Sequence, residues 1–270
     1  MHMKDIDWDD TYANGAYIAD AEGYPPRWAA KAQAFRAAFR ARDKCQLDVP
    51  YGPHDRERFD LFLPDAAPRG LVVIVHGGYW LAFDKSWFSH LAAGAIARDF
   101  AVAVPSYVLA PEVPIAMITQ QIASAINTAS GMIPGPIHLA GHSAGGHLVT
   151  RMLCSDITWP GCFPARIARV VSISGVHDLR PLRNTEMNAN FKMDATGAAA
   201  ESPLLHKDHL PIPVVAWVGG DERPVFIEQS QWLARDWQNA DVMIESGKHH
   251  FDVIDGLEDA NSPLMNAVLG

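Results

Sequence analysis

From Leu71 onward, short apolar runs alternate with longer stretches of helical character. Six runs have the length and composition of buried β-strands: residues 71–76, 101–104, 137–140, 170–174, 214–218 and 241–245. The stretches between them that have the length and spacing of helices are residues 87–98, 114–130, 145–155 and 224–240. Runs that are apolar throughout indicate strands covered on both faces. The pattern therefore predicts an α/β fold with a mostly parallel central sheet and helices on both faces.

The residues before the first strong strand have a different character and are expected to form an arm on the main body. Pro25 and Pro26 are expected to end one element. Residues 27–42 follow, rich in Ala, Arg and Lys. Aromatic side chains recur there at spacings of seven and four, which places Trp28, Phe35 and Phe39 on one face of a predicted helix.

Length and composition suit a single domain. The chain has 270 residues, of which 49% are hydrophobic, enough for one large buried core. We expect one domain over residues 1–270, with an N-terminal arm of about residues 1–45 and a small cap-like insertion at about residues 178–205. No apolar run reaches the roughly 18 residues that a membrane span needs, and the first residues lack the apolar core of a secretory signal. A soluble, cytoplasmic protein is therefore expected.

The net charge and the cysteine content limit the classes of binding partner and bound metal that the chain is expected to have. Twenty-two basic and thirty-one acidic residues give a net charge of −9, which disfavours nucleic acids and anionic membranes. A small-molecule substrate is the expected partner, and a homodimer is left open. The cysteines are odd in number and widely spaced, which favours reduced thiols over a disulfide or a zinc site; they are Cys45, Cys154 and Cys162. His142 and His147 are five residues apart and do not share a helical face, so no metal site is predicted.

The sequence Gly141-His142-Ser143-Ala144-Gly145 lies between the predicted strand 137–140 and the predicted helix that follows. It fits G-x-S-x-G in the strand-turn-helix context in which this motif presents a nucleophile. Glycines suit the sharp turn because a Cβ there would collide with neighbouring backbone. Ser143 is therefore the candidate nucleophile.

A second glycine loop, His76-Gly77-Gly78-Tyr79-Trp80, follows the first strong strand. A loop in this place commonly donates backbone N–H groups to the oxyanion of an acyl-transfer reaction. Gly77 and Gly78 can approach a carbonyl oxygen closely, and Ala144 N–H at the start of the helix is the complementary donor. Each such donor contributes about 3 to 4 kcal/mol of transition-state stabilisation.

A serine hydroxyl needs a general base. In folds that carry the G-x-S-x-G motif between a strand and a helix, the acid and then the histidine follow the serine along the chain. Asp221 comes after the strand ending at Val218, and His250 comes after the last strand. We take these two as the acid and the base. Three alternatives remain: His249 competes with His250, Glu222 competes with Asp221, and Asp178 is another possible acid that we interpret as a cap on the following segment.

Taken together, these motifs resemble the kynurenine formamidase (arylformamidase) branch of the α/β-hydrolases, close to the hormone-sensitive-lipase-like esterases. The resemblance covers about residues 55–260. It includes the H-G-G-x-W and G-x-S-x-G motifs and three later segments: Asp178-Leu179-Arg180-Pro181-Leu182 with Asn188 and Ser202-Pro203, Asp221 ahead of Pro224, and His250-Phe251-Asp252. The family's histidine directly precedes a phenylalanine, which favours His250. Two residues separate Asp221 from Pro224, where the family has one.

The resemblance implies a serine hydrolase that cleaves a formyl or acetyl group from an aromatic amide or ester, with N-formylkynurenine as the family's named substrate. A general short-chain carboxylesterase and a non-catalytic binding module are the alternatives. Tyr79, Trp80, Phe83 and Phe191 are expected to line an aromatic pocket, and a bulky Trp80 beside the oxyanion hole would suit a small acyl group. No metal or organic cofactor is expected, because base catalysis and oxyanion donors supply the chemistry.

Overall fold

The computed structural model describes residues 6–161 and 163–270, and an eight-stranded sheet forms its centre. The strand order is β1-β2-β4-β3-β5-β6-β7-β8. Neighbours from β4 to β8 run parallel, and β2 is antiparallel to both β1 and β4. The strands are β1 (Cys45–Pro50), β2 (Arg58–Phe62), β3 (Leu71–Val75), β4 (Ala101–Pro105), β5 (Ile137–His142), β6 (Ile167–Ile173), β7 (Val214–Gly219) and β8 (Ala240–Glu245). The predicted mostly parallel α/β fold is confirmed.

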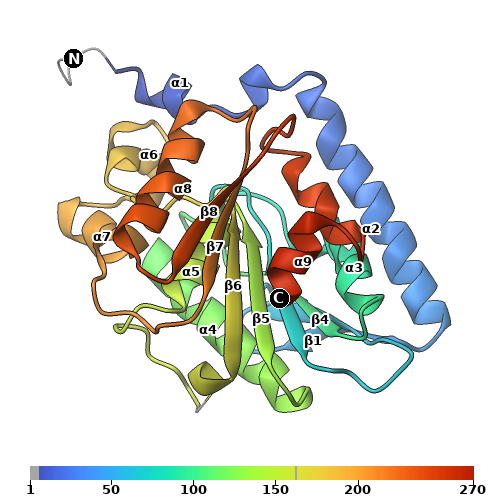
Figure 1. Ribbon diagram of the computed structural model, residues 1–270. Helices are drawn as coiled ribbons and strands as arrows, with labels where there is room; N and C mark the ends of the chain where they lie inside the picture. The colour runs from blue at the N-terminus through green and yellow to red at the C-terminus, as the bar shows by residue number, and fades with distance from the viewer. Residues whose placement is uncertain (1–5, 162) are drawn as a thin grey trace.

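Helices cover both faces of this sheet (Figure 1). Helices α4 (Ile115–Met132), α5 (Ala144–Arg151) and α8 (Pro224–Asp236) pack on one face, and α2 (Tyr24–Ala41), α3 (Ala93–Ile96) and α9 (Pro263–Leu269) pack on the other. The remaining α-helices are α1 (Trp8–Tyr12), α6 (Asn188–Phe191) and α7 (Ala195–Ala200). Short 3-10 helices are η2 (Gly15–Tyr17), η3 (Ala21–Gly23), η4 (Lys85–Trp87), η5 (Ser89–Ala92), η6 (Phe163–Arg166), η7 (Pro181–Asn184), η8 (Pro203–Leu205) and η9 (Val253–Glu258).

The apolar pattern of the sequence does not predict strand β2, because this strand has a charged side chain buried in the sheet. Asp60 is fully buried, and its carboxylate lies 2.8 Å from Lys85 Nζ and 3.2 Å from Arg36 Nε. A buried carboxylate is tolerated only when such partners compensate the lost hydration. Both partners are distant in sequence. The residues Arg58–Phe62 therefore do not show, on their own, the pattern of a buried strand.

The N-terminal helix differs from its prediction at its start. Helix α2 begins at Tyr24 and includes both Pro25 and Pro26, which were expected to end an element. Prolines are compatible with the first helical turn, where backbone N–H groups have no helical partner. Trp28 and Phe39 are buried, as the aromatic spacing predicts, and Trp28 packs 5.5 Å from the ring of Phe88. Residues 87–98, predicted as one helix, form short 3-10 turns followed by the single turn of α3.

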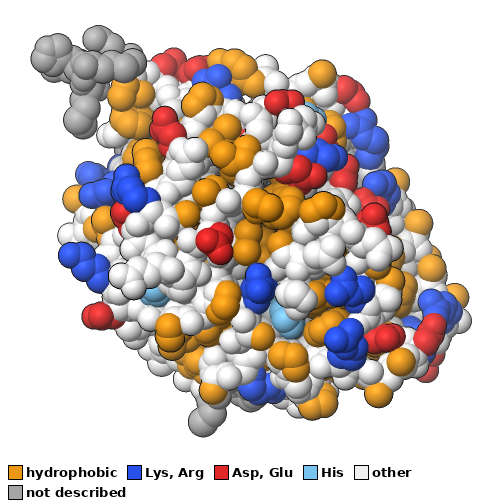
Figure 2. Space-filling view, in the orientation of Figure 1, with side chains coloured by type: hydrophobic (Ala, Val, Ile, Leu, Met, Phe, Trp, Pro, Cys, Tyr) orange, Lys and Arg blue, Asp and Glu red, His pale blue; other side chains and the backbone are white. Residues whose placement is uncertain are grey.

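The visible face of the molecule and the hydropathy of its helices bear on possible charged and membrane-spanning regions. Acidic and basic side chains are interspersed on the face that Figure 2 shows. Among the described residues, none of the helices combines the length and the hydropathy needed to cross a bilayer.

The buried histidines predict acid-sensitive stability. Burial lowers the pKa of His76 and His177 to about 4 and that of His147 to about 3, and the pKa of His142 also falls well below its usual value. The unfolded chain binds protons on these rings near pH 6.5 and the folded chain does not, so stability must fall as the pH drops from about 6.5 towards 4. Each ring contributes up to about 1.4 kcal/mol per pH unit.

Urea unfolding at several pH values measures this effect. We expect the free energy of unfolding to decrease steeply between pH 6.5 and pH 5, above the range in which most carboxylates titrate. An unchanged free energy across that interval would contradict the prediction.

Candidate active site

Ser143 sits on a tight turn between β5 and α5. Its backbone has φ 54° and ψ −115°, a conformation that L-residues rarely adopt, and its N–H donates to Ile173 O at 2.8 Å. A Cβ on Gly141 would lie 2.1 Å from Gly145 O, and a Cβ on Gly145 would lie 2.0 Å from Val75 O. The two glycines are therefore required by close backbone approach, and the turn that carries Ser143 depends on them.

Gly145→Ala is accordingly expected to destabilise the fold by more than about 3 kcal/mol, because backbone atoms of β3 would have to move. Gly131→Ala is the matched control: Gly131 lies in α4, and its added Cβ meets nothing within 4 Å. This control should raise stability by about 0.5 to 1 kcal/mol through helix propensity. Thermal or urea unfolding compares the two, and similar effects in both variants would refute the steric argument.

His250 and Glu222 form a buried pair. His250 Nδ1 lies 2.6 Å from Glu222 Oε2, and the Glu222 side chain is fully buried. The other carboxylate oxygen, Oε1, accepts hydrogen bonds from Gly219 N at 2.8 Å and from Ser174 Oγ at 2.5 Å. Three donors thus hold the Glu222 carboxylate in one position, and that carboxylate orients the imidazole of His250.

The prediction that Asp221 is the acid paired with His250 is wrong, because the carboxylate beside His250 is that of Glu222. Asp221 is exposed, and its backbone N–H donates to Lys248 O at 2.9 Å. The turn after β7 directs position 221 outward and position 222 inward, so Glu222, the competing residue, reaches His250. One residue separates Glu222 from Pro224. That spacing, which Asp221 does not have, was the signal that could have selected Glu222.

The choice of His250 over His249 agrees with the geometry. His249 Nε2 lies 3.0 Å from Tyr24 Oη, on the side of α2, and its Nδ1 lies 3.2 Å from the carboxylate of Asp252. His142 further fixes the position of His250, because His142 Nε2–H donates to the backbone oxygen of His250 at 2.8 Å.

The glycine loop after β3 lies directly against the serine turn. A Cβ on Gly77 would lie 3.0 Å from Ser143 Cβ, and Gly78 has φ +107°, which favours glycine. The preceding His76 is stacked between the rings of Phe88 and Tyr107, and its Nδ1–H donates to Gly77 O at 2.7 Å. Ala144 begins α5 on the other side of Ser143. The structure thus brings Gly77, Gly78 and Ala144 around the serine.

Ser143 and His250 line the same cavity of about 470 Å³. Its wall is mainly apolar and aromatic, and it combines the glycine loop after β3, the N-terminal arm and the loop after β8. The lining residues are Asp9, Tyr12, Ala13, Asn14, Gly15, Pro25, Trp28, Gly77, Gly78, Tyr79, Leu81, Ala82, Phe83, Phe88, His142, Ser143, Met187, His250 and Phe251.

Two of the four predicted pocket residues, Tyr79 and Phe83, line this cavity, and the other two do not. Trp80 is fully buried and Phe191 is 3% exposed, and their rings meet edge to face at 5.7 Å in the core. Tyr79 and Trp80 both have left-handed backbone conformations, and the turn sends the Trp80 ring towards His147 of α5. Trp28 and Phe251 also line the cavity and were not predicted from the sequence. Their contribution to the wall depends on how α2 and the loop after β8 pack.

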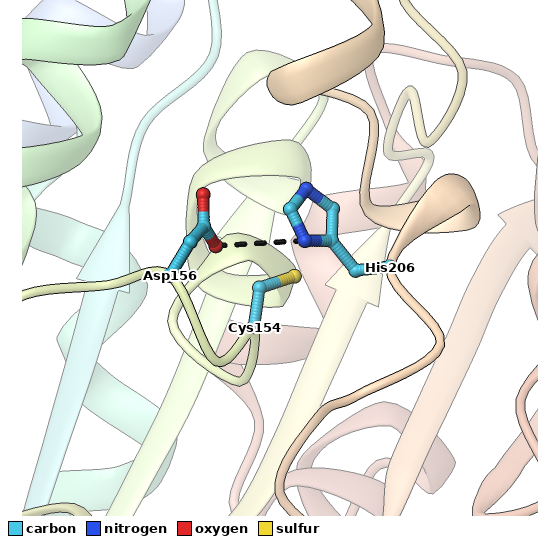
Figure 3. A group of neighbouring side chains, drawn as sticks. All are labelled: Cys154, Asp156 and His206. Atoms are coloured by element: carbon cyan, nitrogen blue, oxygen red, sulfur yellow. Dashed lines mark ion pairs between the residues drawn. The ribbon is translucent and has the colours of Figure 1, made fainter.

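A group of potential metal ligands lies elsewhere, at the end of α5. Ligand atoms of Cys154, Asp156 and His206 lie within 4.8 Å of one another (Figure 3). Arg151 already donates two hydrogen bonds to the Asp156 carboxylate, at 2.9 and 2.7 Å, and burial raises the pKa of Cys154 to about 12. A neighbouring guanidinium and a protonated thiol do not suit a cation, so we assign this group a structural ion pair. Cys162 lies outside the described residues.

Known proteins share the fold of this chain and part of its sequence. A family model described as the alpha/beta hydrolase fold matches residues 72–245. A kynurenine formamidase of Danio rerio is 29% identical over 247 residues, which cover 85% of this chain and 83% of the relative. An isoprenylcysteine alpha-carbonyl methylesterase of Arabidopsis thaliana is 36% identical over 76% of this chain and 56% of its own length.

A crystal structure of a protein from Silicibacter sp. TM1040 is similar over nearly the whole chain. It is 53% identical in sequence with a TM-score of 0.95, and the match covers 98% of this chain and all of that one. That protein has been suggested to be a thioesterase.

Proposed function

Because the chain belongs to the alpha/beta hydrolase fold family, we propose that it is a serine hydrolase that removes a formyl or acetyl group from an aromatic amide or ester. The observation that carries the proposal is the Glu222–His250 pair at a cavity that Ser143 also lines. Kynurenine formamidases among the relatives make N-formylkynurenine the first substrate to test.

In this proposal, Ser143 Oγ attacks the substrate carbonyl while His250 Nε2 takes its proton. Glu222 accepts the Nδ1–H of His250, which leaves Nε2 as the basic nitrogen and stabilises the imidazolium once it forms. Backbone N–H groups of Gly77, Gly78 and Ala144 bind the oxyanion. His250 then protonates the departing amine or alcohol, and water repeats the cycle on the acyl enzyme.

The cavity supports an aromatic substrate. Trp28, Phe83 and Phe251 give its wall flat apolar surfaces, and about 470 Å³ accommodates a substituted benzene ring. The small acyl group rests on the similarity to kynurenine formamidases, because Trp80 lies in the core and does not narrow the cavity. The free thiols Cys45 and Cys154 are consistent with a small-molecule hydrolase of the cytoplasm.

A short-chain carboxylesterase is the second candidate, and one observation favours it. The charged side chain on the cavity wall, apart from histidine, is the acidic Asp9, and no Lys or Arg is among the described lining residues. The α-carboxylate of N-formylkynurenine would therefore have no cationic partner in the cavity. An uncharged aryl ester needs none.

Formate release from N-formylkynurenine, compared with hydrolysis of p-nitrophenyl acetate, separates the two candidates. If N-formylkynurenine is the substrate, the kcat/KM for the formamide should equal or exceed that for the ester. A far larger value for the ester would select the carboxylesterase. Labelling of Ser143 by a fluorophosphonate tests both against a non-catalytic binding module, in which an unactivated serine stays unlabelled.

A further inference from the structure

Asn14 is a buried amide without a partner at the wall of the active-site cavity. Its residue is 7% exposed, and neither Oδ1 nor Nδ2 has a hydrogen-bond partner among the described residues. Buried side-chain amides are normally hydrogen-bonded, because leaving one unpaired carries the full cost of removing it from water. Asn14 is one of the residues that line the active-site cavity, and both of its amide atoms are covered, so a ligand group there can complete the amide once the side chain turns towards it.

Asn14 is held in place by contacts on both sides of it along the arm. Tyr12 O accepts a hydrogen bond from Tyr79 Oη at 2.7 Å, which ties the arm to the oxyanion loop. Three residues after Asn14, the ring of Tyr17 lies 3.7 Å from the guanidinium carbon of Arg223, which directly follows Glu222. Arg223 also donates to the carboxylate of Asp10 at 2.7 Å. The amide is thus presented from a fixed backbone, as a specificity contact requires.

We propose that Asn14 binds an uncharged polar group, a carbonyl or hydroxyl, on the part of the substrate that does not react. This inference rests on the proposed serine hydrolase function and deepens it. An amide offers one acceptor and two donors but no net charge, and Asp9 is the neighbouring ionic group on the wall. A carboxylate would meet that negative charge without a cation, so an uncharged group fits the site.

The small cavity behind Asn14 supplies the rival explanation. About 10 Å³ in volume, it is lined by Asn14, Glu222 and His250 among others, and it is close to the size that one water molecule needs. An amide that serves only to hold such a water would act on every substrate alike. The two roles therefore differ in whether the effect of Asn14 depends on the polar group of the substrate.

Matched aryl acetates test this difference. The acetylphenyl acetates, with the ketone at the ortho, meta or para position, are each compared with the isopropylphenyl acetate of the same shape. Wild type is expected to favour the ketone at one position at least, and Asn14→Leu is expected to lower that preference in kcat/KM about tenfold, the usual effect of one lost hydrogen bond. Taking the ratio between variant and wild type removes the intrinsic reactivity of each ester. Asn190→Leu, at an exposed asparagine outside the cavity wall, is the matched control and should leave the preference unchanged.

The outcomes are separable. If wild type cleaves none of the esters and Ser143 resists a fluorophosphonate, the proposed function has failed. If wild type is active but Asn14→Leu changes ketone and isopropyl esters equally at all three positions, the inference about Asn14 is overturned. The thermal midpoint gives a second readout: replacing an unpartnered amide by leucine should leave it unchanged or raised, and a marked fall would show that Asn14 is structural. Asn14→Ala repeats the comparison without added bulk.

Discussion

Ser143→Ala is expected to lower kcat by about 10⁶-fold, the loss typical of removing the nucleophile of a serine hydrolase. The turn geometry gives the physical reason. Ser143 is fixed in a conformation with φ 54° between the glycine loop and α5, and no second hydroxyl lies on that turn. With alanine there, the imidazole of His250 has no hydroxyl to deprotonate, and only oxyanion binding and positioning remain. Single-turnover kinetics with an activated aryl ester measure the loss.

Ser155→Ala is the control for this experiment, because Ser155 is exposed and lies after the end of α5. It should retain wild-type kcat and full labelling by a fluorophosphonate. A Ser143→Ala variant that keeps more than a tenth of the activity would mean that another residue attacks the substrate. The unfolding temperature of both variants should stay near that of wild type, since alanine removes one oxygen atom and opens no large cavity.

The central strands could be predicted because each contains a short run that is mostly apolar. β3, for example, reads Leu-Val-Val-Ile-Val, and every one of its residues is buried. β1 could not be predicted in this way, because it lies at the edge of the sheet and its residues alternate between half-buried and exposed. The motif at Ser143 was predictable for a local reason: its two glycines are required by atoms a few residues away or on the adjacent strand.

The cavity wall was less predictable, because it depends on side-chain directions and on contacts between distant segments. Tyr79 and Trp80 are consecutive aromatic residues, yet the first faces the cavity and the second the core. The sequence of these two residues does not determine which side chain faces the core. Asn14 shows the same limit more clearly: its burial results from the packing of an arm against loops that begin at residues 77 and 221, more than sixty and two hundred positions away.

The identity of the acid is where the sequence analysis and the structure differ most clearly. The sequence analysis selects Asp221, and the structure selects the adjacent Glu222, so substitutions at the two positions should have different effects on activity. Glu222→Gln is expected to lower kcat by about 10⁴-fold, and Asp221→Asn is expected to leave it within about twofold. The glutamine keeps the size of the side chain but loses the charge that stabilises the imidazolium. Its amide N–H₂ can also face Nδ1, which would place the proton of the neutral ring on Nε2, where it cannot accept one from Ser143.

The hydrogen bonds around Glu222 sharpen the interpretation of that result. Ser174 Oγ and Gly219 N both donate to Oε1, so a glutamine can keep its carbonyl oxygen on these donors only by turning its N–H₂ towards His250. The protein therefore selects the unproductive tautomer, and the loss should appear in kcat with little change in KM. Ser174→Ala removes one of the two donors but preserves the charge, and a loss of about tenfold is expected from the looser carboxylate. A large loss in Asp221→Asn with near-normal activity in Glu222→Gln would show that the loop after β7 rearranges when substrate binds.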